Sequence, residues 1–182
     1  MNQLLLTNGS VVNEGRIAEA DLLITGDRIE RIGQGAIPAG TEVIDLKGQY
    51  VLPGIIDDQV HFREPGMTHK AGIASESRAA IAGGVTSYLD MPNNVPPCIS
   101  RSGLAAKKAI AAGSSFANYG FYLGATNTNI DEVKAATVAD AWGSRCSWAH
   151  QRVTCWSTTR SRWRRFSRRP HYRLRPTASI HR

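Results

Sequence analysis

The chain has 182 residues, a formal net charge of +7 and a pI near 9.7, but these values average two unlike parts. All 15 acidic residues lie at or before Asp140, where 11 lysines and arginines give 11 − 15 = −4, whereas Trp142–Arg182 carries 11 arginines, no lysine and no acid. No signal peptide or membrane segment is apparent, and three cysteines without ligand-like spacing support neither a disulfide framework nor a zinc ribbon. We therefore expect a cytoplasmic protein.

The first 52 residues consist of short β-rich segments separated by turn signals. These segments are Leu4–Val12, Ala20–Ile24, Arg28–Ile32, Val43–Leu46 and Gln49–Leu52. The dipeptide Gly26-Asp27 is typical of a hairpin turn between the second and third segments. The pattern predicts a small antiparallel β-domain over residues 1–52, with little chemistry of its own.

Strands and helices alternate beyond Pro53. The expected strands are Ile55–Phe62, Val85–Met91 and Ala117–Leu123, and the expected helices are Ser75–Ile81, Ser102–Ala112 and Ile130–Ala136. Gly83-Gly84 is a helix-stop signal and Asn129 is expected to cap the third helix. A repeat of roughly 30 residues predicts parallel βα units. We predict an α/β fold in which residues 53–141 form an incomplete TIM-like barrel of about three such units, where a closed barrel needs eight.

Residues 57–66, Asp-Asp-Gln-Val-His-Phe-Arg-Glu-Pro-Gly, bring polar groups to the end of the first of these strands. In an α/β barrel that end carries the chemistry. Gln59 and His61 lie two residues apart and are predicted to share one strand face, as a metal-binding pair would. Glutamine is a weak neutral ligand compared with imidazole. A single strand-end histidine is also commonly a hydrogen-bonded structural residue, so both interpretations of His61 stay open.

Arg63 and Asn93 are candidates for an anion site. The guanidinium of Arg63 presents donors suited to a carboxylate or phosphate, and the alternative is an ion pair with Glu64 or Asp58. Asn93 follows the next strand, where its amide either completes the anion site or only shapes the turn. Two further loop residues are expected to be solvated, namely His69 and Lys70.

Three segments resemble dihydroorotases, in register and with matching separations: Asp57–Lys70 (DDQVHFREPGMTHK), Ser75–Ser87 (SESRAAIAGGVTS) and Met91–Pro96 (MPNNVP). Ala20–Leu52 also resembles the small β-domain that precedes the barrel in cyclic amidohydrolases. Allantoinases are similar, but typically show Asn-Glu-Pro-Gly and Met-Pro-Leu at the positions of Arg63–Gly66 and Met91–Asn93. The resemblance covers about residues 1–140.

The resemblance implies a zinc-dependent, reversible ring closure of N-carbamoyl-aspartate to dihydroorotate in pyrimidine synthesis. Zinc would lower the pKa of a bound water and polarise the ring amide carbonyl. By the same resemblance, His61 and the substituted Gln59 are metal ligands, Arg63 and Asn93 hold the substrate carboxylate, and no catalytic residue is assigned. The alternative is an allantoinase- or hydantoinase-type substrate. A small-molecule partner is expected rather than a membrane or nucleic acid, and a homo-oligomer is left open for the intact family member.

From Trp142 onward the sequence departs from this pattern. Dihydroorotases continue with a strand that holds a metal-bridging lysine and another that holds a histidine ligand, and neither follows Asp140. In a displaced reading frame, however, Trp142–Trp156 permits GVKVFMGSSTGNML and Pro176–Arg182 permits HCEDTP, which resemble those two motifs. We therefore predict that residues 142–182 are a frameshifted, disordered tail and that the chain as written is inactive. The alternative is a non-catalytic homologue whose Arg- and Trp-rich extension binds nucleic acid.

Overall fold

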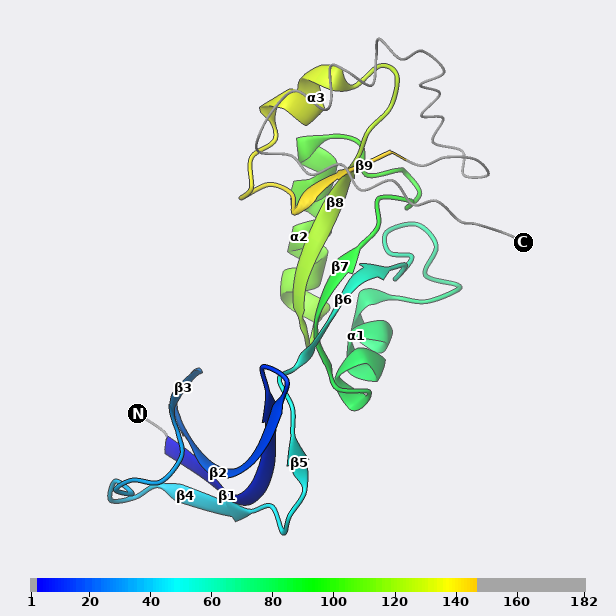
Figure 1. Cartoon of the computed structure of the whole chain (residues 1–182). Helices are drawn as coiled ribbons and strands as arrows, with labels where there is room; N and C mark the ends of the chain where they lie inside the picture. The colour runs from blue at the N-terminus through cyan, green and yellow to red at the C-terminus, as the bar shows by residue number, and fades with distance from the viewer. Residues whose placement is uncertain (1–2, 147–182) are drawn as a thin grey trace, which may run out of the picture. The chain divides into compact units, whose positions relative to one another are not determined.

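The computed structural model describes residues 3–146, which divide into two compact units after Pro53 (Figure 1). Most of the tail that we predict to be frameshifted and disordered, from residue 147 on, lies outside the described residues. None of the helices within residues 3–146 is long and apolar enough to cross a membrane.

The first unit is a five-stranded sheet of mixed direction. Its strands are β1 (Gln3–Asn13), β2 (Arg16–Thr25), β3 (Arg28–Ile32), β4 (Glu42–Asp45) and β5 (Tyr50–Val51). The order is β3-β2-β1-β4, and β5 also pairs with β1. Hairpins make β1–β2 and β2–β3 antiparallel, whereas β4 and β5 run parallel to β1. The predicted small β-domain is thus confirmed. The prediction that its sheet is antiparallel throughout is wrong, because the longer connection after β3 lets β4 pair with β1 in the parallel direction.

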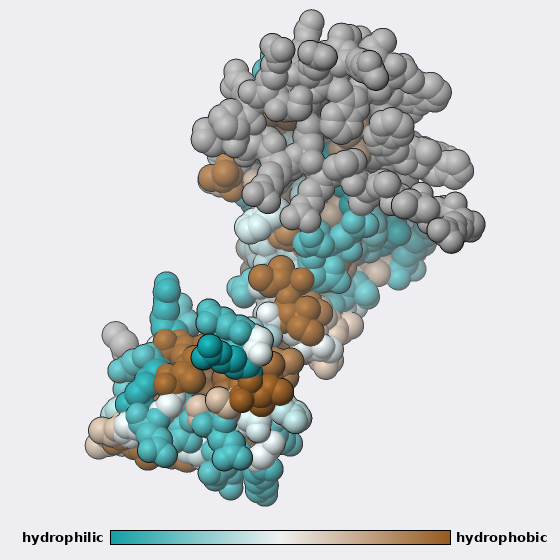
Figure 2. Space-filling view, viewed as in Figure 1, coloured by the Kyte–Doolittle hydropathy of each residue, from teal (hydrophilic) through white to brown (hydrophobic). Residues whose placement is uncertain are grey.

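The first unit leaves much of its apolar surface uncovered. Its buried apolar side chains are Leu5, Val11, Leu22 and Leu23. Large apolar side chains of this unit remain exposed in greater number, namely Ile17, Ile29, Ile32, Ile37, Val43, Ile44, Tyr50 and Leu52. Figure 2 shows hydrophobic surface on this unit. Such a small core makes the unit marginal as an independent fold.

The second unit alternates parallel strands with helices. Its elements are β6 (Ile55–Val60), α1 (Ile73–Ala82), β7 (Val85–Asp90), α2 (Arg101–Ser114), β8 (Asn118–Gly124), α3 (Ile130–Ala135) and β9 (Gly143–Arg145). The sheet order is β6-β7-β8-β9, with every pair parallel. The incomplete TIM-like barrel is therefore confirmed. The short fourth strand, β9, lies in the tail from Trp142 on that we predicted to be disordered, and that prediction is wrong for residues 142–146, because Gly143–Arg145 pairs with β8. Three residues are too few to show a strand period in the sequence.

The two faces of this sheet bury different side chains. Tyr88, Phe121 and Leu123 belong to one apolar cluster with buried residues of the helices, among them Ile73, Leu104, Ala111 and Val133. Leu89, Met91 and Tyr122, which alternate with them along β7 and β8, form a separate cluster. Because side chains alternate along a strand, Asp90 shares the helix-covered face with Tyr88.

Asn129 occupies the N-cap position of α3, as predicted, but its side chain makes no capping hydrogen bond to the helix. Its side-chain amide donates to the carbonyl groups of Ile99 (2.7 Å) and Gly124 (2.8 Å), and its Oδ1 accepts the N–H of Thr126 (2.7 Å). These loop partners use the groups that a cap would offer to the helix. Ser100 does cap α2 through its hydroxyl, in a hydrogen bond of 3.1 Å to a backbone N–H of the first turn.

Two glycines with the same backbone conformation differ in their surroundings. Gly84, which follows α1 and confirms the expected helix stop, has φ +84° and open space where a Cβ would lie. Gly66 has φ +83°, but a Cβ there would overlap the carbonyl oxygen of Val95. Gly66 is therefore required by space as well as by backbone angle.

We expect Gly66→Ala to destabilise the chain more than Gly84→Ala. The Gly84 substitution adds only left-handed backbone strain, about 1 kcal/mol. The Gly66 substitution must also displace the backbone of Val95, for a total of about 3 kcal/mol or more. Urea unfolding followed by circular dichroism measures both changes. Equal losses would show that Val95 can move at little cost.

Candidate functional site

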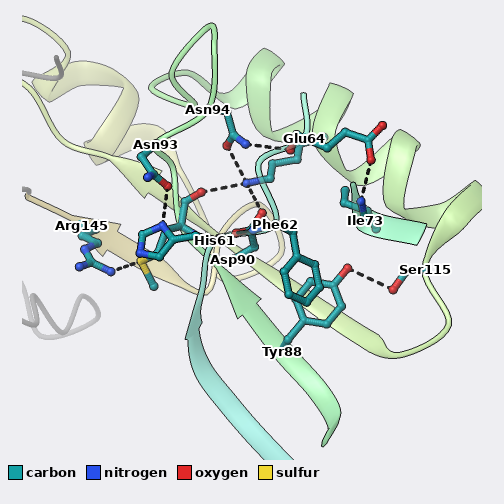
Figure 3. A network of polar contacts seen from close by, with 12 residues as sticks. His61, Phe62, Glu64, Ile73, Tyr88, Asp90, Asn93, Asn94, Ser115 and Arg145 are labelled. Atoms are coloured by element: carbon teal, nitrogen blue, oxygen red, sulfur yellow. Dashed lines mark hydrogen bonds and ion pairs between the residues drawn. The ribbon is translucent and has the colours of Figure 1, made fainter. Parts of the chain in front are cut away.

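His61 and Asn93 come together where β6 and β7 end (Figure 3). Nδ1 of His61 lies 2.8 Å from Oδ1 of Asn93. Because an amide oxygen only accepts hydrogen bonds, Nδ1 carries the proton of this contact. In the neutral ring, Nε2 then keeps its lone pair. The pair therefore presents one imidazole nitrogen that can accept a proton or bind a ligand.

Gln59 does not take part in this contact. Its side chain is exposed, and its backbone N–H bonds to the carboxylate of Asp57 at 3.0 Å. The pairing of β6 with β7 shifts register between Asp57 and Val60, which interrupts the alternation that placed Gln59 and His61 on one face. The assignment of both residues as metal ligands stays a prediction.

The described residues do not fit a complete zinc site. Between residues 3 and 146, no three His, Cys, Asp or Glu side chains lie close enough to hold a metal ion. A catalytic zinc normally has three protein ligands. Among residues 3–146, His61 alone offers an imidazole at the ends of β6 and β7, and we assign no chemical step to a metal here.

Arg63 has a strained backbone and donors that residues 3–146 do not use. Its φ is +67°, a conformation that costs a residue with a side chain about 1 kcal/mol or more. Within the described part of the chain its guanidinium forms no ion pair with Glu64 or Asp58, the two expected partners. The Glu64 carboxylate instead accepts the N–H of Ile73 at 2.7 Å. A partly buried guanidinium with unused donors is suited to an anion.

A buried ion pair, which the sequence reasoning missed, lies beneath these residues. Nζ of Lys107 lies 2.8 Å from Oδ2 of Asp90, and each side chain is only 1% exposed. Oδ1 of Asp90 accepts the backbone N–H groups of Phe62 (3.0 Å) and Met91 (2.9 Å). Nζ of Lys107 donates to the carbonyl of Met91 (2.9 Å) and to Oδ1 of Asn94 (2.7 Å). One ion pair thus holds backbone at the ends of both β6 and β7 (Figure 3).

Asn94 and Glu64 extend this network to α1. The amide of Asn94 donates to the carbonyl of Glu64 at 2.8 Å, and the Glu64 carboxylate accepts from the first residue of α1, Ile73. The loops after β6 and β7 are therefore tied to each other and to two helices. His69 and Lys70, farther along the first loop, are exposed as expected.

The sequence did contain a signal for the ion pair. Lys107 lies three residues after Leu104 and four before Ala111, so it belongs to the buried stripe of α2. Asp90 closes a strand whose preceding residues are apolar and buried. A lysine and an acid in such positions are rarely buried unless they are paired.

Burial shifts the pKa values of three nearby groups, and it keeps Cys98 and Tyr88 protonated at neutral pH. Burial raises the pKa of the Cys98 thiol to about 11, although the charge of Lys107 acts in the opposite direction. Burial likewise raises the pKa of Tyr88 to about 12, against the effect of its hydrogen bond to Ser115. Burial lowers the pKa of the Arg145 guanidinium, which contacts the sulfur of Met91. Cys98 and Tyr88 therefore offer neither a nucleophile nor a base.

The amidohydrolase family profile matches residues 50–164. This chain belongs to the amidohydrolase family. The matched range runs past Trp142, where we expected the resemblance to end. An allantoinase of Solibacter usitatus is 38% identical over 134 residues, which are 73% of this chain and 29% of that protein. A dihydroorotase of Carboxydothermus hydrogenoformans is 47% identical over 96 residues, which are 52% of this chain and 22% of that protein.

Solved structures give the same result for the fold. The L-hydantoinase of Arthrobacter aurescens matches with a TM-score of 0.74 and 26% identity over 80% of this chain and 33% of that one. The match to this chain therefore covers a third or less of the length of the allantoinase, the dihydroorotase and the L-hydantoinase. The resemblance to dihydroorotases is confirmed at 45–47% identity over about half the chain, while allantoinases match a longer stretch at lower identity.

Proposed function

We propose that this chain carries the substrate-anchoring part of a dihydroorotase-like enzyme, which interconverts dihydroorotate and N-carbamoyl-aspartate. The observation that carries the proposal is the state of Arg63, whose partly buried guanidinium has no ion-pair partner within residues 3–146. Arg63 lies two residues after His61, which contacts Asn93. Dihydroorotate bears a carboxylate, which two parallel N–H groups of an arginine bind well. The dihydroorotase relatives, at up to 47% identity, support the same substrate class.

Each of the three side chains has a separate task in this proposal. Arg63 binds the substrate carboxylate, and the amide N–H groups of Asn93 supply further donors to it. Oδ1 of Asn93 holds Nδ1 of His61 at 2.8 Å, which leaves Nε2 to face the substrate as an acceptor. In the reaction, water adds to the ring amide carbonyl and the C–N bond breaks. We propose zinc for the complete enzyme, with ligands beyond those that residues 3–146 provide.

Allantoin or a hydantoin is the second candidate substrate. The allantoinase match extends over 134 residues, and an L-hydantoinase has a closely similar fold. Neither allantoin nor unsubstituted hydantoin carries a carboxylate. Arg63 would then have no anion to bind, and its replacement would change turnover little.

We expect Arg63→Ala to raise the KM for dihydroorotate about 10- to 100-fold, because a hydrogen bond to a charged group contributes roughly 1.5–3 kcal/mol. The assay uses protein made from a gene whose reading frame is restored near codon 140. A matched control is Arg78→Ala, since Arg78 is exposed and lies over the ring of Phe116. Faster turnover of allantoin or hydantoin than of dihydroorotate, unaffected by Arg63→Ala, would assign the second substrate class.

A further inference from the structure

The buried network includes residues that are adjacent in the chain to His61, Arg63 and Asn93. Phe62, whose N–H bonds to Asp90, stands between His61 and Arg63. Asn94, which accepts from Lys107, directly follows Asn93. Within residues 3–146, the side chains of His61, Arg63 and Asn93 form no hydrogen bond or ion pair with Asp90 or Lys107. The ion pair nevertheless holds the backbone next to them, at Phe62 after β6 and at Met91 after β7.

Holding the helix to the sheet does not require charges. In a protein interior the cost of desolvation offsets much of the attraction between two charges, and apolar side chains of similar volume commonly stabilise as well. What Asp90 and Lys107 add is direction, since together they make four hydrogen bonds aimed at Phe62, Met91 and Asn94. These bonds specify where the loops after β6 and β7 lie relative to each other.

We propose that Asp90 and Lys107 are positioning residues that hold the His61 ring against Asn93 and thereby fix the tautomer with the proton on Nδ1. Loss of the pair lets the two loops move independently, and His61 then exchanges between tautomers as a free imidazole does. The use of the exposed Nε2 in a reaction rests on the proposed function, whereas the tautomer itself does not.

Nuclear magnetic resonance of the 182-residue chain with ¹⁵N-labelled histidine tests the proposal without any substrate. Long-range ¹H–¹⁵N spectra at pH 8 report which ring nitrogen is protonated, and His61→Gln assigns the His61 signals. We expect one tautomer, protonated on Nδ1, in the unsubstituted chain. A ring protonated mainly on Nε2 would overturn the proposal.

The double variant Asp90→Leu/Lys107→Met removes both charges and all four hydrogen bonds and puts apolar side chains of similar volume in their place. We expect it to fold and to show a His61 tautomer mixture dominated by the Nε2–H form, as in free histidine. The matched control is Val11→Ala, which weakens the packing of the buried Val11 in β1 of the first unit and leaves His61 in its single tautomer. A folded double variant that keeps the pure Nδ1–H form would overturn the proposal.

Hydrogen exchange decides the matter if the double variant does not fold. In the unsubstituted chain, the amide of Phe62, whose N–H bonds to Asp90, should be protected as strongly as those of the buried β7 residues Tyr88 and Leu89. The amide of Met91 is not used, because it also donates to the carbonyl of Val60 at 3.0 Å. Exchange at the rate of an exposed loop would overturn the proposal. Because no arm uses turnover, failure of the proposed substrate assignment would leave these results standing, and the reverse also holds.

Discussion

The purified 182-residue chain, supplied with zinc, is expected to hydrolyse dihydroorotate no faster than buffer does. A catalytic zinc normally has three protein ligands, and no three suitable side chains meet within residues 3–146. His61 provides an imidazole there, while Gln59 is exposed and offers only a neutral amide. The measurement is ring opening of dihydroorotate with and without zinc. Zinc-dependent turnover that disappears in His61→Ala would contradict this expectation.

The frame-restored protein is the control for this experiment. Reading the nucleotide sequence over codons 136–182 comes first, since a sequence that cannot spell GVKVFMG in the displaced frame excludes the frameshift. The alternative, a non-catalytic homologue with a nucleic-acid-binding extension, predicts a gel shift that weakens steeply with salt. Absence of both turnover and a shift leaves the frameshift as the explanation that fits the arginine-rich, acid-free composition of Trp142–Arg182.

Lys107→Met is expected to cost about 3–5 kcal/mol of unfolding free energy, because it leaves the Asp90 carboxylate buried without its partner. The two side chains are each 1% exposed and 2.8 Å apart. Lys134→Met is the matched control, since the Lys134–Asp131 pair has side chains that are 49% and 94% exposed. For such an exposed pair we expect a change of about 0–1 kcal/mol. Urea unfolding by circular dichroism measures both.

A Lys107→Met chain that is already unfolded in the absence of urea also agrees with the expected large loss of unfolding free energy. Adding Asp90→Asn to Lys107→Met should recover much of the loss, because no unpaired charge then remains in the core. If Lys107→Met and Lys134→Met shift the urea midpoint equally, the Asp90–Lys107 pair is not buried in solution.

Local patterns were enough to predict the order of elements and the family. Strand β3 has the predicted bounds, Arg28–Ile32, and α1 ends before Gly83-Gly84, because turn residues and apolar periods act over a few neighbouring positions. The motifs around His61 and Asn93 likewise indicated a cyclic amidohydrolase before the fold was known. The family match over residues 50–164 agrees with that prediction.

Only the tertiary structure decided which distant groups meet. The direction of β4 depends on its pairing with β1, and a register shift in β6 interrupts the alternation that seemed to join Gln59 to His61. The Asp90–Lys107 pair joins a strand to a helix that begins eleven residues after that strand ends. A period within one segment specifies which face of it is buried. It does not specify the partner segment or the register, since these depend on contacts between segments far apart in the chain.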